Sequence, residues 1–208
     1  MYSQRQRIYP ALGKEREARA QLEDWVRTRQ AKGRDLALLT RIFSSEGSAL
    51  VVLGRAEELS TIEEWRRSNA ADPDFQARSA KLVEIVRQPV QTSLFDMVIP
   101  VPRGSGGTIV VRAHGYPKPG KERPARSIVE ELARSGQAAG VRQGVGVGIY
   151  SSTGSVIELT TVYADLAELG RVRKERASIM GEATRAFGEL SRAPIAQRMF
   201  EVVVPFKS

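Results

Sequence analysis

Apolar residues recur with a helical period in two stretches of the chain that start 107 residues apart (125 − 18). Both stretches place them at positions i, i+4, i+7 and i+8, which lie along one side of a helix. The first set is Ala18, Leu22, Trp25 and Val26, and the second is Ala125, Val129, Leu132 and Ala133. Because the spacing is kept while the residues change, the pattern predicts two equivalent amphipathic helices, each packed on a core.

The sequence around these helices repeats as well. The segment Tyr9–Arg19 returns as Tyr116–Arg126, with Tyr-Pro and Gly-Lys-Glu-Arg in the same places (116 − 9 = 107). Farther along each copy the offset is 105, since Phe95 falls on Phe200 (200 − 95). A fixed offset over a long stretch indicates an internal duplication. We therefore predict two units, 1–102 and 103–208, joined by a Pro/Gly/Ser-rich linker.

Each copy reads as strand, helix, hairpin, helix, strand. Alternating or β-branched runs predict the first strands at 2–8 and 108–114 and the last strands at 93–99 and 198–204. Glycine-containing turns at 45–47 and 152–154 predict the hairpins. In copy one, Asp72-Pro73 predicts a helix restart, with Asp as the N-cap. The fold class that follows is α+β, as two tandem ferredoxin-like βαββαβ units with antiparallel sheets.

Helices on one face of such a sheet leave the other face bare. Apolar strand residues such as Leu36–Leu39 and Leu50–Leu53 would then meet water, and a patch of that kind is normally an interaction surface. We expect the two sheets to pack face to face into an intrachain α/β barrel. The sequence leaves open whether the barrel closes between two chains instead, which would make a homodimer.

Two stretches of copy one carry a resemblance to a known family. The opening Met1–Arg5 with Leu12-Gly13-Lys14, and the segment Glu63–Arg67 with its following Ala70–Ala77, resemble the first strand, Gly-Lys turn and second helix of NIPSNAP-like proteins. That resemblance implies the dimeric α/β barrel superfamily. The superfamily spans cofactorless monooxygenases, haem-dependent enzymes, isomerases and members without an assigned activity, so fold alone does not choose a function.

The composition of the chain excludes several kinds of site and partner. The chain has no cysteine, which excludes disulfides and thiolate chemistry, and its one histidine makes a zinc site improbable. Net charge is +8, but the basic residues are spread among acidic ones on helical stretches, which is typical of solvated faces rather than a nucleic-acid surface. The sequence shows neither an apolar run that could span a membrane nor a signal peptide. We expect a cytoplasmic protein with no metal, no cofactor, no nucleic-acid partner and no membrane partner.

Charged residues share one face of each first strand. Alternation puts Arg5 and Arg7 together in copy one, and Arg112 and His114 together in copy two. Carboxylates on the neighbouring strands complete the candidate site: Asp96, Glu158 and Glu201. We predict His114 and Glu158 as catalytic residues. The predicted ligand-binding residues are Arg5, Arg7, Arg112, Asp96 and Glu201.

Two interpretations of these charges stay open. The pairs Arg5–Asp96 and Arg112–Glu201 would, as ion pairs, only fix the pairing of strands, and structural networks of this kind outnumber functional sites. Alternatively the arginines hold a carboxylate-bearing ligand, whose geometry a guanidinium matches. His114 has the possible roles of general base, general acid or haem ligand, although a single histidine is more often incidental.

Alternating glycines in copy two bear on the same question. Gly144, Gly146 and Gly148 remove the side chains from one face of a predicted strand. This leaves room for a ligand or for close packing with the other half of the chain.

Three functions compete on this evidence. The first hypothesis is a NIPSNAP-like protein of unassigned activity that binds a small organic ligand, neutral or anionic, in a cavity between the two sheets. The alternative is a cofactorless monooxygenase or isomerase acting on a small substrate in that cavity. RNA binding is the weakest. RNA-recognition domains of this strand order place two or three stacking aromatics on the open sheet, whereas the predicted strands offer Phe43 and Tyr150 and no Lys/Arg-Gly-Phe-type run.

Overall fold

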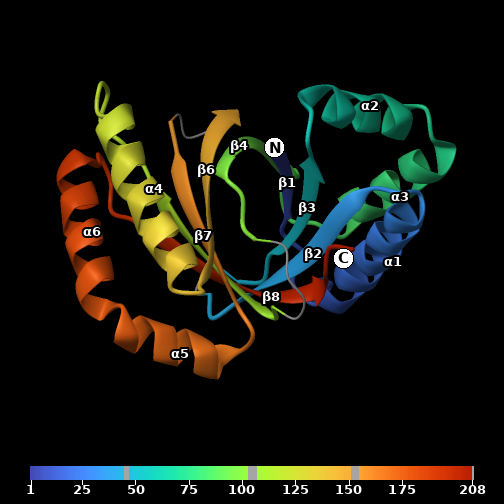
Figure 1. Cartoon of the computed structure of the whole chain (residues 1–208). Coiled ribbons are helices and arrows are strands. Elements are labelled where there is room, and N and C mark those ends of the chain that lie inside the picture. The colour runs from blue at the N-terminus through green and yellow to red at the C-terminus, as the bar shows by residue number, and fades with distance from the viewer. Residues whose placement is uncertain (45–46, 103–106, 151–154, 208) are drawn as a thin grey trace. The chain divides into compact units, whose positions relative to one another are not determined.

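A computed structural model describes residues 1–44, 47–102, 107–150 and 155–207 of the chain. Copy one contains, in order, β1 (Tyr2–Ile8), α1 (Glu15–Ala31), β2 (Asp35–Ile42), β3 (Leu50–Ala56), α2 (Leu59–Ala70), α3 (Pro73–Glu84) and β4 (Gln91–Ile99). Copy two contains β5 (Ile109–Gly115), α4 (Glu122–Ala138), β6 (Arg142–Tyr150), β7 (Ile157–Tyr163), α5 (Leu166–Glu175), α6 (Ala177–Leu190) and β8 (Ala196–Val204). The predicted order of elements is therefore confirmed, with one helix restart in each copy (Figure 1).

The chain forms two compact units that each contain one antiparallel sheet. The first unit comprises Met1–Leu94 and Val202–Lys207, and the second comprises Phe95–Glu201. The first sheet runs from the start of β4 through β1, β3 and β2 to the end of β8, and the second runs from the start of β8 through β5, β7 and β6 to the end of β4. Each copy's last strand thus serves both sheets. This is the strand order of a closed antiparallel barrel, and it confirms the predicted fold class.

The first unit folds around the predicted helix stripe. Ala18, Leu22 and Val26 of α1 are buried against apolar residues of β2 and β3, among them Leu38 and Val52. Register explains which strand residues take part, because alternate positions point to the helices and the others point away. The helices therefore bury one face of this sheet, as the sequence predicts.

The hairpin turns lie mostly outside the described residues. Residues 45–46 and 151–154, and residues 103–106 of the linker, are not described by the structure. Gly47 is described and has a φ of 84°, the left-handed conformation for which glycine was predicted in this turn. Asp72 caps α3 as predicted, because its carboxylate accepts hydrogen bonds from the backbone N–H groups of Asp74 and Phe75.

A glutamine in each first helix anchors the shared strands. In the first unit, the Gln30 amide donates to the carbonyls of Leu36 and Pro205, both at 2.7 Å. In the second unit, the Gln137 amide donates to the carbonyls of Gln143 at 2.6 Å and Pro100 at 3.1 Å. Gln137 is the repeat counterpart of Gln30 (137 − 107 = 30). Each glutamine therefore ties the residue just beyond one copy's last strand to the first helix of the other copy.

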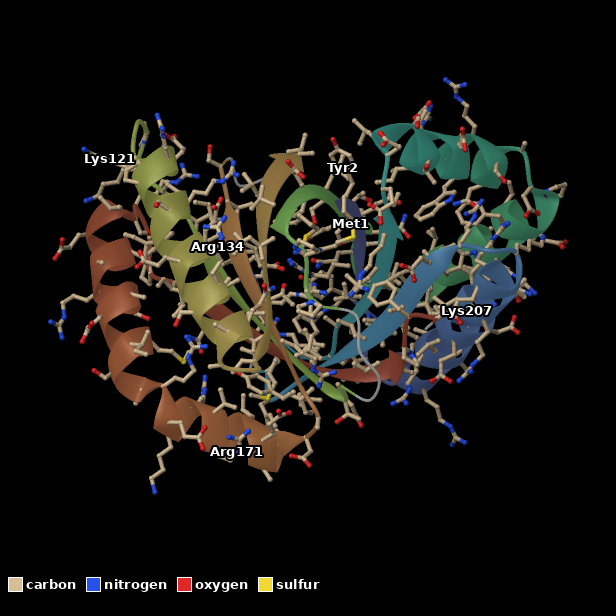
Figure 2. The ribbon with its side chains drawn as sticks, in the orientation of Figure 1. Met1, Tyr2, Lys121, Arg134, Arg171 and Lys207 are labelled. Atoms are coloured by element: carbon tan, nitrogen blue, oxygen red, sulfur yellow. The ribbon has the colours of Figure 1, made fainter. Side chains whose placement is uncertain are left out.

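Charged residues cover the outer faces of the helices. In the second unit, Glu130 accepts from Arg126 and Arg134 within α4, and Arg171 pairs with Glu175 in α5. Figure 2 shows Lys121, Arg134 and Arg171 at the outer surface. These i,i+4 pairs are the solvated helix faces expected from the sequence.

Candidate functional site

The second sheet brings Arg112, His114 and Glu158 together on the face that points away from the helices. His114 on β5 lies opposite Glu158 on β7, and Arg112 lies opposite Thr160 on β7 and Arg198 on β8. Residues directly opposite one another share a face of an antiparallel sheet. Arg112, His114 and Glu158 are all buried, and Glu158 is completely inaccessible.

Hydrogen-bond geometry fixes the roles within this cluster. His114 Nε2 lies 2.8 Å from Glu158 Oε2, and Arg198 Nη1 lies 3.3 Å from His114 Nδ1. Because a guanidinium only donates, Nδ1 must be the acceptor, so Nε2 carries the proton and donates it to Glu158. The other carboxylate oxygen of Glu158 accepts from the hydroxyl of Thr160 and lies 3.9 Å from Arg112 Nε. This pattern of donors and acceptors places His114 between a carboxylate and a guanidinium.

This arrangement occupies both ring nitrogens of His114. A general base needs a lone pair directed at its substrate, and an iron ligand needs a free ring nitrogen. The Nδ1 atom of His114 is taken up by its contact with Arg198. Arg112 stacks over Phe200, with 5.1 Å between its guanidinium carbon and the ring centroid. As it stands, the cluster is a buried polar network that joins β5, β7 and β8.

Glu201 does not join Arg112, contrary to the predicted pair. The register places Glu201 opposite Ile109, while the residue opposite Arg112 is Arg198. Glu201 is exposed, and because it is three positions from Arg198 its side chain lies on the other face of the sheet. Sequence reasoning identified the right neighbouring strand but could not fix its register.

The remaining predicted residues belong to separate units. Arg5 and Arg7 lie on the face of β1 that points away from the helices, and Arg5 is buried. Arg7 donates to the hydroxyl of Tyr9 at 3.4 Å and to Gln91 at 3.5 Å. Asp96 is partly exposed and lies in the second unit, so its pairing with Arg5 stays a prediction.

The alternating glycines of β6 serve close packing. A Cβ placed on Gly144 would lie 2.8 Å from the carbonyl oxygen of Ile99, and one on Gly146 would lie 3.3 Å from the ring of Phe95. Both approaches involve β4, which runs beside β6 in the second sheet. Of the two open interpretations, the structure therefore favours strand packing over room for a ligand at these two positions.

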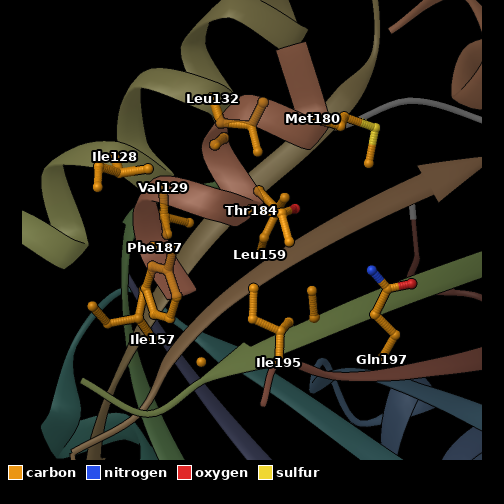
Figure 3. Close-up of a pocket in the computed structure, with 13 residues that line it drawn as sticks. Ile128, Val129, Leu132, Ile157, Leu159, Met180, Thr184, Phe187, Ile195 and Gln197 are labelled. Carbon is orange, nitrogen blue, oxygen red and sulfur yellow. The ribbon is translucent and has the colours of Figure 1, made fainter. Parts of the chain in front are cut away.

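A pocket lies on the opposite, helix-facing side of the second sheet (Figure 3). It measures about 60 Å³, several times the roughly 10–15 Å³ that one water needs. Its walls come from β5, β7, α4, α6 and the start of β8, and they are almost entirely apolar: Ala113, Gly115, Ile128, Val129, Leu132, Ile157, Leu159, Met180, Ala183, Thr184, Phe187, Ile195 and Gln197. The sequence predicted a cavity on the other face, and gave no indication of this one.

Gly115 and Phe187 shape one end of the pocket. A Cβ on Gly115 would lie 2.2 Å from two atoms of the Phe187 ring, far closer than side chains approach. Glycine is therefore required at the end of β5 for the ring to lie there. Phe187 is buried in a core cluster with Ala125, Ala133 and Ile157, so its ring is held in place at this end of the pocket.

Gln197 and Thr184 supply the polar atoms at the rim. Both are exposed, and Arg173 Nη2 of α5 donates to Gln197 Oε1 at 2.9 Å. Arg173 also lies near Tyr163; burial raises the pKa of that phenol, and the positive charge of Arg173 opposes the rise. The rim of the pocket therefore carries hydrogen-bond donors and positive charge.

Among the residues that the structure describes, no three acidic or histidine side chains gather in a way that could hold a metal ion. A helix able to cross a bilayer is likewise absent from the described ranges.

Comparison with known proteins shows the fold of the chain. No family model and no curated protein matches the sequence. Among solved structures, a candidate monooxygenase from Fusobacterium nucleatum subsp. nucleatum aligns with a TM-score of 0.77 and 12% identity, over 100% of this chain and 94% of that one. An anthrone oxidase-like protein aligns with a TM-score of 0.67 and 12% identity, over 97% and 91% of the two chains.

A third solved structure names the fold. It is an uncharacterised ferredoxin-fold protein from Listeria monocytogenes, related to antibiotic biosynthesis monooxygenases, with a TM-score of 0.53 and 10% identity over 97% and 95% of the chains. At these identities the likeness concerns architecture alone. The chain therefore has the ferredoxin-like α/β barrel fold of these proteins, and its activity has to be argued from its own residues.

Proposed function

We propose that the chain binds a small, largely apolar organic molecule in the helix-facing pocket of its second unit. The observation that carries this proposal is the pocket lining, in which eleven of the thirteen residues are apolar or glycine and only Thr184 and Gln197 are polar. Ligand sites are typically concave and apolar with a few placed polar groups. We expected the ligand in a cavity between the two sheets, and the pocket moves the proposed site to the other face of the second sheet.

The difference between the two copies supports this assignment. The repeat counterpart of Gly115 is Ile8 (115 − 107), and the counterpart of Leu132 is Trp25 (132 − 107). Both counterparts fill space: Ile8 is buried in the first core, and Trp25 packs against it. The hollow on the helix side of the first unit measures only about 20 Å³, which is room for about one water. The hollow beside Trp25 in copy one is therefore smaller than the helix-facing pocket of copy two.

Binding can be read at a single methionine. Of the four methionines, Met180 lines the pocket, while Met97 is buried on β4 and does not. With the methionine methyls labelled with carbon-13, titration with toluene should shift the Met180 resonance and leave Met97 in place. A folded protein whose Met180 resonance does not respond to toluene would refute the proposal.

A pair of variants on α6 makes the assignment specific. Ala183 lines the pocket, and Ala186 is exposed on the same helix outside it. Ala183→Phe should fill the pocket and weaken toluene binding by at least about tenfold, whereas Ala186→Phe carries the same loss of helix propensity and should bind normally. Equal binding by both variants would show that toluene sits elsewhere.

The second candidate function is a cofactorless oxygenase, and the names of the structural neighbours favour it. One is described as a candidate monooxygenase and one as anthrone oxidase-like. We propose oxygen uptake with anthrone as the assay. Turnover lost in Ala183→Phe and kept in His114→Gln would place the reaction in the helix-facing pocket. The reverse result would instead support the predicted catalytic roles of His114 and Glu158 on the opposite face of the sheet.

The narrower assignment to NIPSNAP-like proteins also belongs to this proposal. It rests on the resemblance of Met1–Arg5, Leu12–Lys14, Glu63–Arg67 and Ala70–Ala77. Ligand binding without turnover would fit a member of unassigned activity, and oxygen uptake would fit the enzymes of the wider superfamily.

A further inference from the structure

The rim of the pocket has a defined polarity, because Arg173 sets the orientation of the Gln197 amide. A guanidinium has donors only, so the atom of Gln197 that faces Arg173 at 2.9 Å must be the carbonyl oxygen. The amide nitrogen of Gln197 then points away from Arg173 with two N–H groups to donate. Figure 3 shows Gln197 at the edge of the pocket, apart from the apolar cluster around Phe187 and Ile157.

Positive charge accompanies these donors. Within the described part of the chain, Arg173 forms no ion pair with a carboxylate, in contrast to Arg171 on the same helix, which pairs with Glu175. Thr184 adds a hydroxyl to the same pocket. The apolar end of the pocket suits a small apolar group, and the rim suits an oxygen acceptor.

We propose that the ligand of this pocket is a small organic carboxylate, with its apolar body against Phe187 and its carboxylate at Gln197 and Arg173. This inference rests on the proposed function and adds the class of ligand to it. A carboxylate at the rim stays partly hydrated, so it gains charge-assisted hydrogen bonds without full burial of its charge. The apolar walls hold the rest of the molecule through contact area.

Benzoate and benzamide make a matched pair of probes, because they differ in charge and hardly in shape. Titrations followed at the Met180 methyl should give a dissociation constant for benzoate about fivefold lower than that for benzamide. Raising the salt concentration should weaken the binding of benzoate and leave the binding of toluene unchanged, because salt screens only the charged probe. Equal affinities for benzoate and benzamide would overturn the inference.

Two variants of α5 assign the effect to one side chain. Arg173→Met removes the charge beside Gln197 and should reduce benzoate affinity about fivefold while toluene still binds. Arg171→Met is the control, because Arg171 is exposed and lies outside the pocket, and it should leave both affinities unchanged. Unchanged benzoate affinity in Arg173→Met would overturn the inference. If the unaltered protein does not bind toluene, the proposed binding function is refuted instead. Failure of the inference and failure of the proposed function are therefore distinguishable.

Discussion

The contact between Gly115 and Phe187 gives a sharp prediction for stability. Replacing Gly115 by Ala would put a methyl carbon 2.2 Å from the Phe187 ring, whereas ordinary contact begins at 3.4 Å. The ring or the strand must therefore yield by about 1.2 Å (3.4 − 2.2). Phe187 is buried and packed on several core residues, so the displacement cannot be absorbed at a free surface.

The change in the free energy of unfolding is the sum of two opposing effects. Overpacking a core of this kind costs about 1–3 kcal/mol, while replacing glycine by alanine inside a strand gains roughly 0.5–1 kcal/mol of backbone entropy. We expect Gly115→Ala to lower the free energy of unfolding by about 1 kcal/mol, within a range of roughly 0–2.5 kcal/mol. The measurement is urea unfolding followed by far-ultraviolet circular dichroism, which reports on the helices of both units.

Two further variants serve as controls for the steric explanation. Gly170→Ala on α5 meets nothing within 4 Å, so it should stabilise the protein as glycine-to-alanine changes in helices do. In a Phe187→Leu background the steric conflict is relieved, so Gly115→Ala should cost little there. If Gly115→Ala stabilises the protein, or if its cost is the same with leucine at 187, then the reasoning about this contact is wrong.

The remaining predictions concern the buried polar groups and the α3 cap. Glu158→Gln replaces the buried charged acceptor beside Arg112 and His114 by a neutral amide and should destabilise the fold by about 1–3 kcal/mol in urea unfolding; unchanged stability would argue against a stabilising role of this charge. Gln30→Ala removes two hydrogen bonds to buried or partly buried backbone carbonyls and should cost about 1–3 kcal/mol by the same assay. Gln137→Ala removes one partly buried and one exposed hydrogen bond and should cost less, about 1 kcal/mol; stability equal to that of the unaltered protein in both variants would exclude an anchoring role. Arg29 chiefly, with the α3 backbone, lowers the pKa of Asp72 below its ordinary 3.8, so the stability it adds is present above that value and is lost as pH falls through the lowered pKa. The thermal midpoint of Asp72→Asn should accordingly lie below that of the unaltered protein near neutral pH and approach it in acid, whereas a difference independent of pH would contradict this origin.

The repeat made most of the fold accessible from the sequence. Local periodicity was enough to place Ala18, Leu22 and Val26 in the first core and to give Asp72 its capping role, because both depend on residues within a few positions of each other. The restart of a helix in copy two was not predicted, since no Asp-Pro marks it. There the bend between α5 and α6 places Arg176 in a buried position, where it donates to Ser135 at 3.0 Å, a tertiary contact that spacing does not reveal.

The division of the chain shows a similar limit. We propose that 1–102 and 103–208 are the duplicated units, as the repeat indicates. The compact units nevertheless exchange the ends of their last strands, and the hydrogen bonds of Gln30 and Gln137 join residues far apart in sequence. Nothing local marks these glutamines, although their recurrence at the same place in both copies was a usable indication.

The candidate site was only partly predictable for the same reason. Alternation on strands put His114 and Glu158 on the same face, and the β5–β7 register places them directly opposite each other. The pairing of Arg112 with Glu201 was wrong because it depends on the register of β8 against β5. The helix-facing pocket depends on Gly115 and Phe187 meeting across 72 residues (187 − 115), which no periodicity indicates.

The most direct test of the account is to locate a bound probe by contacts between protons. Nuclear Overhauser effects between the ring protons of toluene and labelled protein methyls report neighbours within a few ångströms. The account predicts contacts to Met180 and Ile157, which line the helix-facing pocket of the second unit, and none to Met97. Contacts to Met97 in their place, or none to any methyl of the pocket, would contradict it.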